Sequence, residues 1–195
     1  VLKVLSMVDV LKGIHAVNLA DAVTLRRMLR GVNVFFIPNG VNCERFKPIA
    51  RKRGDVFQVI FVGALSEDKG VDIVLKVAEE LKAKYPAMNA KVVIVSTGGP
   101  LEQEVLRAFE KGIVDYRGFL EDNLLADLYA QSHVALFPSR DDTFPLVLLE
   151  AQACGTPVIC SNLIAYKQAV KDRTTGIICK EYSVSAFYRC LNAGL

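Results

Sequence analysis

The chain has 195 residues, of which 52% are hydrophobic and 23% are charged, and its formal net charge is +3. This length suits one domain, or one domain with a short extra segment, and the composition is ordinary for a well-covered α/β protein. The charge is too small to indicate a nucleic-acid partner, and the single basic run, Arg51-Lys52-Arg53, favours a solvated loop.

Cysteine and histidine usage argues against a disulfide framework and against metal ligation. The five cysteines lie far apart without a C-x-x-C pair, and His15 and His133 are isolated, the latter expected to be structural. This pattern indicates reduced, mostly buried thiols in a cytosolic protein. No signal peptide is visible, and no apolar run reaches the roughly 18 residues that a membrane span needs. Both ends, Val1 and Leu195, are expected to be cuts in a longer protein.

The first fifty residues differ in pattern from the rest. The spacing predicts a helix over residues 11–30 and a strand over 34–37, followed by a turn at Pro38-Asn39-Gly40 where Asn and Gly supply positive φ. Gly54-Asp55 marks the expected boundary. We therefore assign residues 1–53 to a linker segment that contains this turn, and residues 54–195 to one main domain.

From residue 57 onward, short apolar runs alternate with segments of helical period. The expected strands are 57–63, 91–97, 114–119, 133–139, 156–161 and 175–179. They are rich in Val and Ile and barely alternate in polarity, which is typical of strands covered on both faces.

The segments between these strands predict helices over 71–81, 101–110, 124–130 and 146–154. Tyr85-Pro86 stops the first helix, Asp122 or Asn123 is the expected N-cap of the third, and Gly155-Thr156-Pro157 ends the fourth. Repeated β–α units demand a parallel sheet with helices on both faces, a Rossmann-like α/β fold. Ligands of such sheets sit outside the carboxyl ends of the strands, at the switch point.

The segment 61–70 (F-V-G-A-L-S-E-D-K-G) has the layout of a phosphate site: a strand, Gly63, a loop, and Lys69-Gly70 opening a helix. Amides at a helix N-terminus favour an anion, and Lys69 adds a full positive charge. The spacing is not that of a Walker loop. The alternative is that Lys69 is a solvated lysine beside a helix start.

The segment 138–159 carries a second group of candidates. A strand ends there, a polar loop follows, and the amides near Phe144 and Leu146, where a helix opens, can meet a phosphate or a sugar. Glu150 stands one turn further in an otherwise apolar run, where an acid needs a partner. Its carboxylate can accept hydrogen bonds from sugar hydroxyls. The alternative is a capped or ion-paired helix carboxylate.

The pair Asp141-Asp142 invites a metal site, since paired carboxylates bind divalent cations together with diphosphates. No aspartate–x–aspartate spacing and no third oxygen ligand lie nearby, so a loop solvated by two acids is favoured and no metal is predicted. No G-x-G-x-x-G follows the first strand, which disfavours a dinucleotide oxidoreductase.

Together with residues 37–48 (I-P-N-G-V-N-C-E-R-F-K-P), these two blocks resemble the retaining, nucleotide-sugar-dependent glycosyltransferases of group 1, which have the two-domain GT-B fold. The family includes glycogen synthases, sucrose synthases and many mannosyltransferases, and the resemblance runs in order from about Ile37 to Cys179. Several positions depart from the family's pattern: Asn42 replaces an aspartate, Ala64 an arginine, Asp142 a glutamate, and Thr143 and Pro145 replace glycines.

The resemblance implies roles for individual residues. Lys69, beside Gly63, would hold the donor diphosphate, although the arginine that completes the family's clamp is missing at Ala64. Glu150 would bind the donor ribose and Asp142 would approach the transferred sugar. The segment from Tyr116 to Leu120, with Phe119 and Leu120, matches the part of the family that lines the base, and residues 97–100 match its G-x-G-P motif.

The mechanism that the resemblance implies uses no metal and no cofactor, because the nucleotide sugar, with UDP or GDP, is itself the donor substrate. The acceptor, a carbohydrate or lipid-linked hydroxyl, would bind an amino-terminal domain absent from this chain, so the fragment alone is expected to bind donor weakly and not to turn over. Some relatives work at membrane surfaces, but no strongly basic amphipathic helix indicates this here. The alternatives are a non-catalytic binding module, or an epimerase or phosphorylase of the same architecture.

Overall fold

A computed structural model of the chain describes residues 13–49, 56–84 and 89–193. The chain divides into two compact units, an N-terminal unit (Val1–Asn39) and a main unit (Gly40–Leu195). The boundary expected at Gly54-Asp55, the basic run 51–53 and the helix stop at Tyr85-Pro86 lie outside the described residues.

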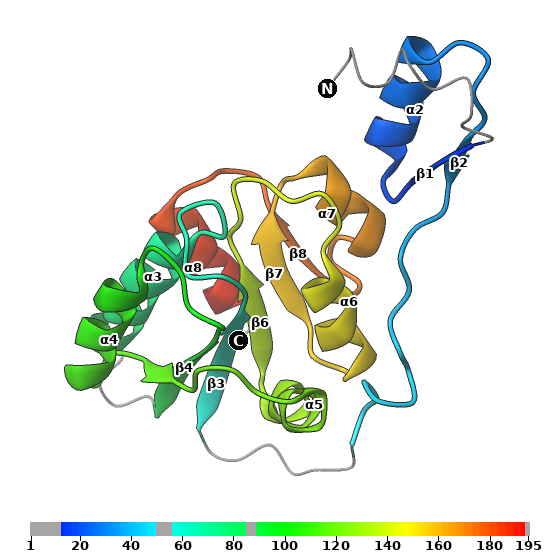
Figure 1. Ribbon diagram of the computed structural model, residues 1–195. Helices are drawn as coiled ribbons and strands as arrows, with labels where there is room; N and C mark the ends of the chain where they lie inside the picture. The colour runs from blue at the N-terminus through cyan, green and yellow to red at the C-terminus, as the bar shows by residue number, and fades with distance from the viewer. Residues whose placement is uncertain (1–12, 50–55, 85–88, 194–195) are drawn as a thin grey trace. The chain divides into compact units, whose positions relative to one another are not determined.

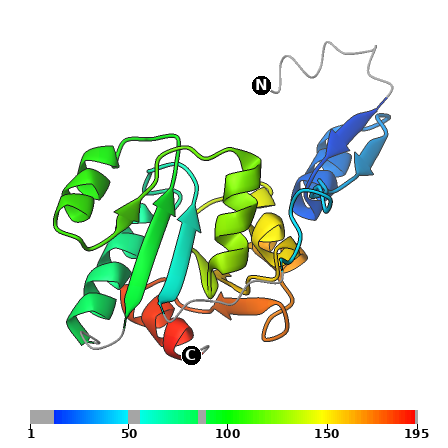
Figure 2. The ribbon, with the colours of Figure 1, turned by 90° about the horizontal axis from the view of Figure 1, so that it is seen from below.

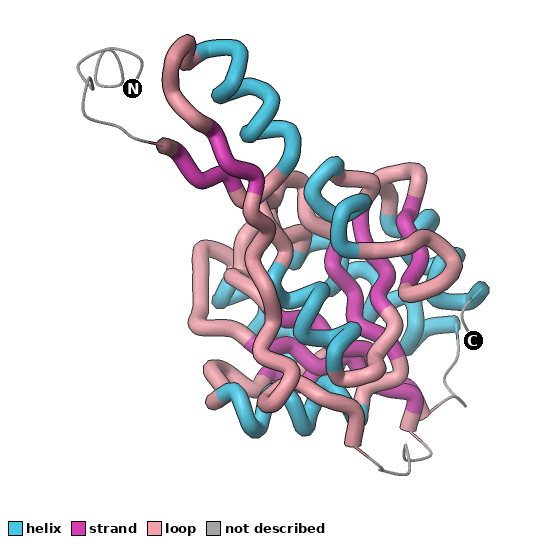
Figure 3. The backbone as a smooth tube through the Cα atoms, turned by 90° about the vertical axis from the view of Figure 1, so that its right-hand side faces the viewer, coloured by secondary structure: helices cyan, strands magenta, loops and turns pink. Residues whose placement is uncertain are grey.

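In the N-terminal unit, two short parallel strands pair side by side, and one helix connects them along the chain (Figure 3). They are β1 (Ile14–Ala16), α2 (Leu19–Met28) and β2 (Val34–Phe36). The helix predicted over 11–30 is therefore wrong at its start. Residues 14–16 pair with the distant residues 34–36, and the helix begins only after Asn18, whose side chain accepts a 2.8 Å hydrogen bond from the amide of Asp21. Periodicity within one segment does not reveal a pairing with another.

The turn expected at Pro38-Asn39-Gly40 is also wrong, since neither Asn39 nor Gly40 has positive φ. The chain turns instead over residues 43–45. Asn42 causes this turn, because its side-chain oxygen accepts from the amide of Glu44 at 3.0 Å and its carbonyl accepts from the amide of Phe46 at 2.8 Å.

The predicted parallel sheet is confirmed in the main unit (Figure 1). Within the described residues its strands are β3 (Phe57–Val62), β4 (Ala90–Val95), β5 (Asp115–Tyr116), β6 (Val134–Phe137), β7 (Val158–Ser161) and β8 (Gly176–Cys179). Their order across the sheet is β5-β4-β3-β6-β7-β8, and every neighbouring pair is parallel. The strand order reverses between β3 and β6, which makes the carboxyl ends of these two strands the switch point.

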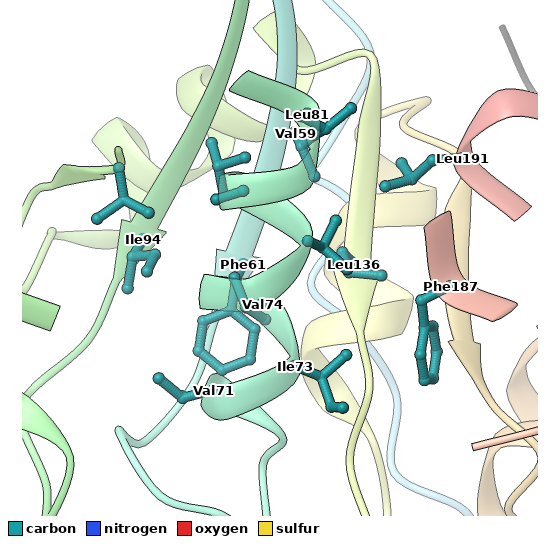
Figure 4. Packing of buried hydrophobic residues seen from close by; sticks show 14 of the residues in the cluster. Val59, Phe61, Val71, Ile73, Val74, Leu81, Ile94, Leu136, Phe187 and Leu191 are labelled. Atoms are coloured by element: carbon teal, nitrogen blue, oxygen red, sulfur yellow. The ribbon is translucent and has the colours of Figure 1, made fainter. Parts of the chain in front are cut away.

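Helices cover both faces of this sheet, as predicted (Figure 2). One face carries α3 (Val71–Lys84), α4 (Glu102–Glu110) and α8 (Val184–Ala193), and the other carries α5 (Asp122–Gln131), α6 (Leu146–Ala153) and α7 (Ile164–Ala169). Alternate residues of a strand enter opposite cores: Val59 and Phe61 face α3, and Ile60 faces α5. Figure 4 shows the core between the sheet and the helices α3, α4 and α8, to which Phe61, Val74 and Phe187 belong.

The cap predicted for the third helix of the main unit is wrong. The N-cap of α5 is Glu121, which makes no side-chain capping hydrogen bond, and Asp122 already lies inside the first turn. The Asp122 carboxylate is engaged elsewhere, in an ion pair with Arg45. The Asp122 side chain, which local spacing predicted as a helix cap, therefore pairs with a residue that is distant in the sequence.

At the switch point, the loops after β3 and β6 meet at Gly70. Gly70 has a φ of +74°, and a Cβ built there would lie 1.9 Å from the carbonyl oxygen of Pro138. Only a residue without a side chain allows the two loops to approach this closely.

Gly70→Ala should therefore destabilise the main unit more than Gly118→Ala does. Gly118 also has positive φ, +62°, but open space around it. The left-handed conformation costs both variants about 1 kcal/mol, and Gly70→Ala should lose a further 1 to 3 kcal/mol, roughly the cost of overpacking. Urea unfolding measures both losses, and equal losses would contradict the close contact.

Candidate functional site

A cavity of about 180 Å³ lies at the carboxyl ends of β3 and β6. Several predicted site residues line it, together with side chains that the sequence did not single out. They come from the loop after β3, the loop between β6 and α6, and α7, and include Gly63, Lys69, Ser139, Asp142, Phe144, Leu146 and Tyr166. The fold thus places these residues together at the switch point, where doubly wound sheets bind ligands.

The charged side chains described at this cavity form one ion pair. The Lys69 ammonium lies 3.0 Å from Asp142 Oδ2, with 34% of the lysine side chain and 12% of the aspartate side chain exposed. Among the described residues that line the cavity, Lys69 is the one cation and Asp142 the one anion. An incoming anion therefore competes with Asp142 for the lysine.

The helix-opening amides contribute less to this site than the sequence suggested. The amide of Lys69 donates to Ser66 Oγ at 3.3 Å, and those of Gly70 and Val71 donate to carbonyls of the same loop at 2.9 and 3.3 Å. The amide of Leu146 donates to the carbonyl of Phe144 at 3.1 Å. Since these four donors are already engaged, they contribute less than the charge of the Lys69 side chain to attracting an anion.

Arg140, which sequence reasoning missed, holds the loop that carries Lys69. Its guanidinium makes two hydrogen bonds to the Asp72 carboxylate, at 2.7 and 2.8 Å, and its amide donates to the carbonyl of Asp68 at 2.7 Å. It also donates to the carbonyl of Glu67 and stacks over the Tyr182 ring at 4.9 Å. The hydrogen bond from Arg140 lowers the pKa of Asp72. Arg140 is thereby committed to the loop and does not replace the arginine missing at Ala64.

Glu150 lies in the second turn of α6 and faces α5 rather than the cavity of Lys69. Burial raises the pKa of Glu150, the nearby charge of Asp122 raises it further, and the adjacent Tyr129 hydroxyl partly offsets both. Tyr129 itself is completely buried. Its hydroxyl makes no hydrogen bond within the described residues, so the partner expected for an acid in this apolar run is not found there. A half-buried carboxylate with raised pKa is a candidate for ligand binding.

The segment expected to line the base lies beside the same helix, α5. Phe119 is 63% exposed, and Leu120 packs against the core beneath α5. The amide of Ser96 donates to the carbonyl of Gly118 at 3.0 Å, which fixes this segment to the end of β4. Phe119 and Leu120 therefore directly precede α5, the helix that Glu150 faces.

Other sequence expectations concern metals, histidine and cysteines. No group of three His, Cys, Asp or Glu side chains able to hold a metal occurs in the described part of the chain. His133 is structural, as predicted: its Nδ1 accepts from the amide of Gln58 at 3.1 Å and its ring packs on Phe57 at 5.1 Å. All five cysteines are free thiols. No helix in residues 13–49, 56–84 and 89–193 has the length and hydrophobicity needed to cross a bilayer.

A second, larger cavity of about 500 Å³ lies beside β8 and α8 and contains none of the predicted site residues. Arg173, Lys180 and Arg189 line it, and Arg189 pairs with Glu181 at 3.2 Å. Its size exceeds that of the switch-point cavity, but it lies away from the carboxyl ends of β3 and β6, where this fold class binds ligands.

The order of strands and the position of the site define a doubly wound α/β domain of the class that binds nucleotides. The family model described as glycosyl transferases group 1 matches residues 42–193. The chain belongs to this family.

Among the most similar proteins are glycosyltransferases that are longer than this chain. D-inositol 3-phosphate glycosyltransferase of Geodermatophilus obscurus is 34% identical over 160 residues, which are 73% of this chain and 36% of the relative. The enzyme of the same name from Acidothermus cellulolyticus is 33% identical over 181 residues, 82% of this chain and 40% of the relative. The chain thus spans well under half the length of these relatives.

Solved structures of GT-B glycosyltransferases share the fold. Sucrose-phosphate synthase from Thermosynechococcus elongatus superposes with a TM-score of 0.79 at 23% identity, covering 98% of this chain and 51% of that one. HepE of Anabaena, solved with UDP and glucose, superposes with a TM-score of 0.75 at 19% identity, and the match covers 93% of this chain and 53% of HepE. The fold expected from the sequence resemblance is confirmed.

The raised pKa of Glu150 predicts how the free energy of unfolding depends on pH. The folded chain binds a proton on Glu150 more tightly than the unfolded chain, so ionisation of this group costs folding free energy. This cost is absent below the ordinary carboxyl pKa of about 4.3 and fully present above the raised folded pKa. Glu150→Gln should therefore be more stable than wild type at neutral pH, with a difference that shrinks as the pH falls toward 4.

Urea unfolding between pH 4 and pH 8 measures this difference. Glu79→Gln on the exposed side of α3 is the matched control, because it removes the same charge from a solvent-exposed position. A stability difference for Glu150→Gln that does not change with pH would show that burial of the Glu150 carboxylate does not raise its pKa.

Proposed function

We propose that this chain is the nucleotide-sugar-binding half of a retaining glycosyltransferase whose donor is a UDP- or GDP-sugar. The observation that carries the proposal is the pairing of Lys69 with Asp142 at the switch point, with Glu150 one turn along the helix that opens beside them. Membership of the group 1 family and the names of the relatives support it. The UDP and glucose in the HepE structure support a uridine donor as the first to test.

Each part of the donor has a chemical counterpart in the site. Lys69 attracts the diphosphate, and Glu150 accepts hydrogen bonds from the ribose hydroxyls. Phe119, exposed beside the start of α5, offers an apolar surface to the base. Asp142 accepts a hydrogen bond from a hydroxyl of the sugar that is transferred. Because Asp142 is shorter than the glutamate of the family's pattern, it selects a sugar whose hydroxyl reaches deeper into the cavity.

The reaction is group transfer with retention at the anomeric carbon. The bond from that carbon to the diphosphate oxygen breaks, a bond to the acceptor oxygen forms on the same face, and the acceptor proton passes to the departing diphosphate oxygen. Lys69 stabilises the negative charge that develops on the departing diphosphate, so its contribution is larger in the transition state than in the bound donor.

The acceptor, a carbohydrate or lipid-linked hydroxyl, binds a further amino-terminal domain in this proposal. The relatives are roughly two to three times as long as the matched segments, since these cover 36% and 40% of them. The N-terminal unit exposes large apolar side chains, among them Leu19, Met28, Phe35 and Ile37, as expected of a surface that another part of the protein covers. The chain alone therefore binds donor without turnover. Its free cysteines support a reducing compartment such as the cytosol.

A second candidate function is a non-catalytic nucleotide-sugar-binding module. Ala64 supplies no charge, Arg140 is committed to Asp72, and Lys69 is neutralised by Asp142. A site with so little net positive charge holds a diphosphate weakly and stabilises its departure less. Activity of a full-length protein that contains this chain, compared with its Glu150→Ala variant, distinguishes the enzyme from the module.

Calorimetric titration of the chain with UDP, GDP and their sugars tests the proposal. Lys69→Met should weaken binding of the diphosphate at least about tenfold, because it removes a charge-assisted hydrogen bond. Lys76→Met, on the exposed side of α3, makes the same change in charge away from the site and should leave affinity unchanged.

The reverse change, Ala64→Arg, restores the missing cation and should strengthen diphosphate binding by a similar factor. Wild type that binds none of these nucleotides would overturn the proposed function. Equal effects of Lys69→Met and Lys76→Met would overturn the role of Lys69.

A further inference from the structure

Tyr166 is a buried tyrosine whose hydroxyl enters the switch-point cavity from α7. The residue is completely buried, and its ring packs in the core formed by α5, α6 and α7. Its hydroxyl oxygen lies 2.6 Å from Ser139 Oγ and 3.1 Å from Asp142 Oδ2. Ser139 is also buried, so this end of the side chain meets polar groups of the site and no bulk water.

The direction of these hydrogen bonds follows from their chemistry. The tyrosine hydroxyl has one proton, and an ionised carboxylate can only accept. Tyr166 therefore donates to Asp142, and its oxygen accepts from the Ser139 hydroxyl. Burial raises the pKa of Tyr166 well above its ordinary value, which keeps this proton in place across the physiological range.

Both donors of the site converge on the same carboxylate oxygen. Lys69 and Tyr166 each lie within hydrogen-bond distance of Asp142 Oδ2. Among the residues that the structure describes, none donates to Oδ1. The carboxylate is thus fixed through one oxygen, and the other is left to accept from a ligand.

We propose that Tyr166, with Ser139, is a positioning residue of the donor site: it orients the Asp142 carboxylate so that Oδ2 holds Lys69 and Oδ1 meets a hydroxyl of the transferred sugar. The proposal rests on the proposed function, because it needs a nucleotide sugar in this cavity. It explains how the short Asp142 keeps a defined orientation, since one donor from the loop after β3 and one from α7 fix it. It also assigns α7 a part in sugar recognition, which the sequence did not indicate.

The effect should appear in recognition of the sugar rather than of the nucleotide. The quantity to measure is the ratio of the affinities for UDP-glucose and UDP, or for GDP-mannose and GDP, whichever pair the chain binds. Tyr166→Phe keeps the ring in the core and removes only the hydroxyl, so this ratio should fall up to about tenfold. Asp142→Ala should lower the same ratio at least as far.

The double variant distinguishes positioning from a general structural effect. If Tyr166 acts through Asp142, then Tyr166→Phe should change the ratio little when Asp142 is already alanine. Tyr188→Phe, which removes a buried tyrosine hydroxyl on the opposite face of the sheet, is the matched control and should leave the ratio unchanged in both backgrounds. Thermal unfolding confirms that each variant is folded at the titration temperature.

The outcomes separate this inference from the proposed function. A wild-type chain that binds no nucleotide or nucleotide sugar would overturn the proposed function and this role with it. Where wild type binds, an unchanged ratio in Tyr166→Phe, or an equal fall in the Asp142→Ala background, would overturn the positioning role alone.

Discussion

The site depends on the contact between two loops at the switch point of the sheet. Gly70 has no side chain and so lies directly against the carbonyl of Pro138, and Arg140 joins the same loops through Asp72. This contact brings Lys69 from the loop after β3 to Asp142 from the loop after β6. Neither strand alone forms the site, because each supplies one member of the ion pair. The parallel strand order places both loops at the same edge.

Electrostatics at this edge are finely balanced rather than strongly positive. Lys69 is paired, and the amides that open α3 are engaged within their own loop. Glu150 is half-buried beside Tyr129 with a raised pKa, an arrangement that costs stability when the carboxylate is ionised. A ligand that bonds to this carboxylate offsets that cost, which is a physical reason for keeping an acid there. In the proposed function, binding of the donor would therefore relieve this unfavourable burial while it competes with Asp142 for Lys69.

Local patterns predicted the main unit well, because both-face burial and helical period are properties of single segments. The strands, the parallel sheet and the position of Gly63 and Lys69 at its edge follow from them. Asp142 was assigned to the site only by the family resemblance, because the local pattern favoured a solvated loop, whereas its side chain is only 12% exposed. Features that depend on contacts between residues far apart in the sequence were not predicted. Residues 14–16, which were predicted to be helical, form a strand that pairs with residues 34–36. Asp122, which was expected to cap α5, forms an ion pair with Arg45 instead. Tyr166 lies 24 residues from Asp142, and no local signal links them.

A crystal structure of this chain with a bound nucleoside diphosphate tests the central claim most directly. The account predicts that one molecule is shared by two side chains, with the Lys69 ammonium within hydrogen-bond distance of a phosphate oxygen and the Glu150 carboxylate within that distance of a ribose hydroxyl. A nucleotide bound instead in the larger cavity beside β8 and α8, or one that touches Lys69 with no ribose hydroxyl within hydrogen-bond distance of Glu150, would contradict it.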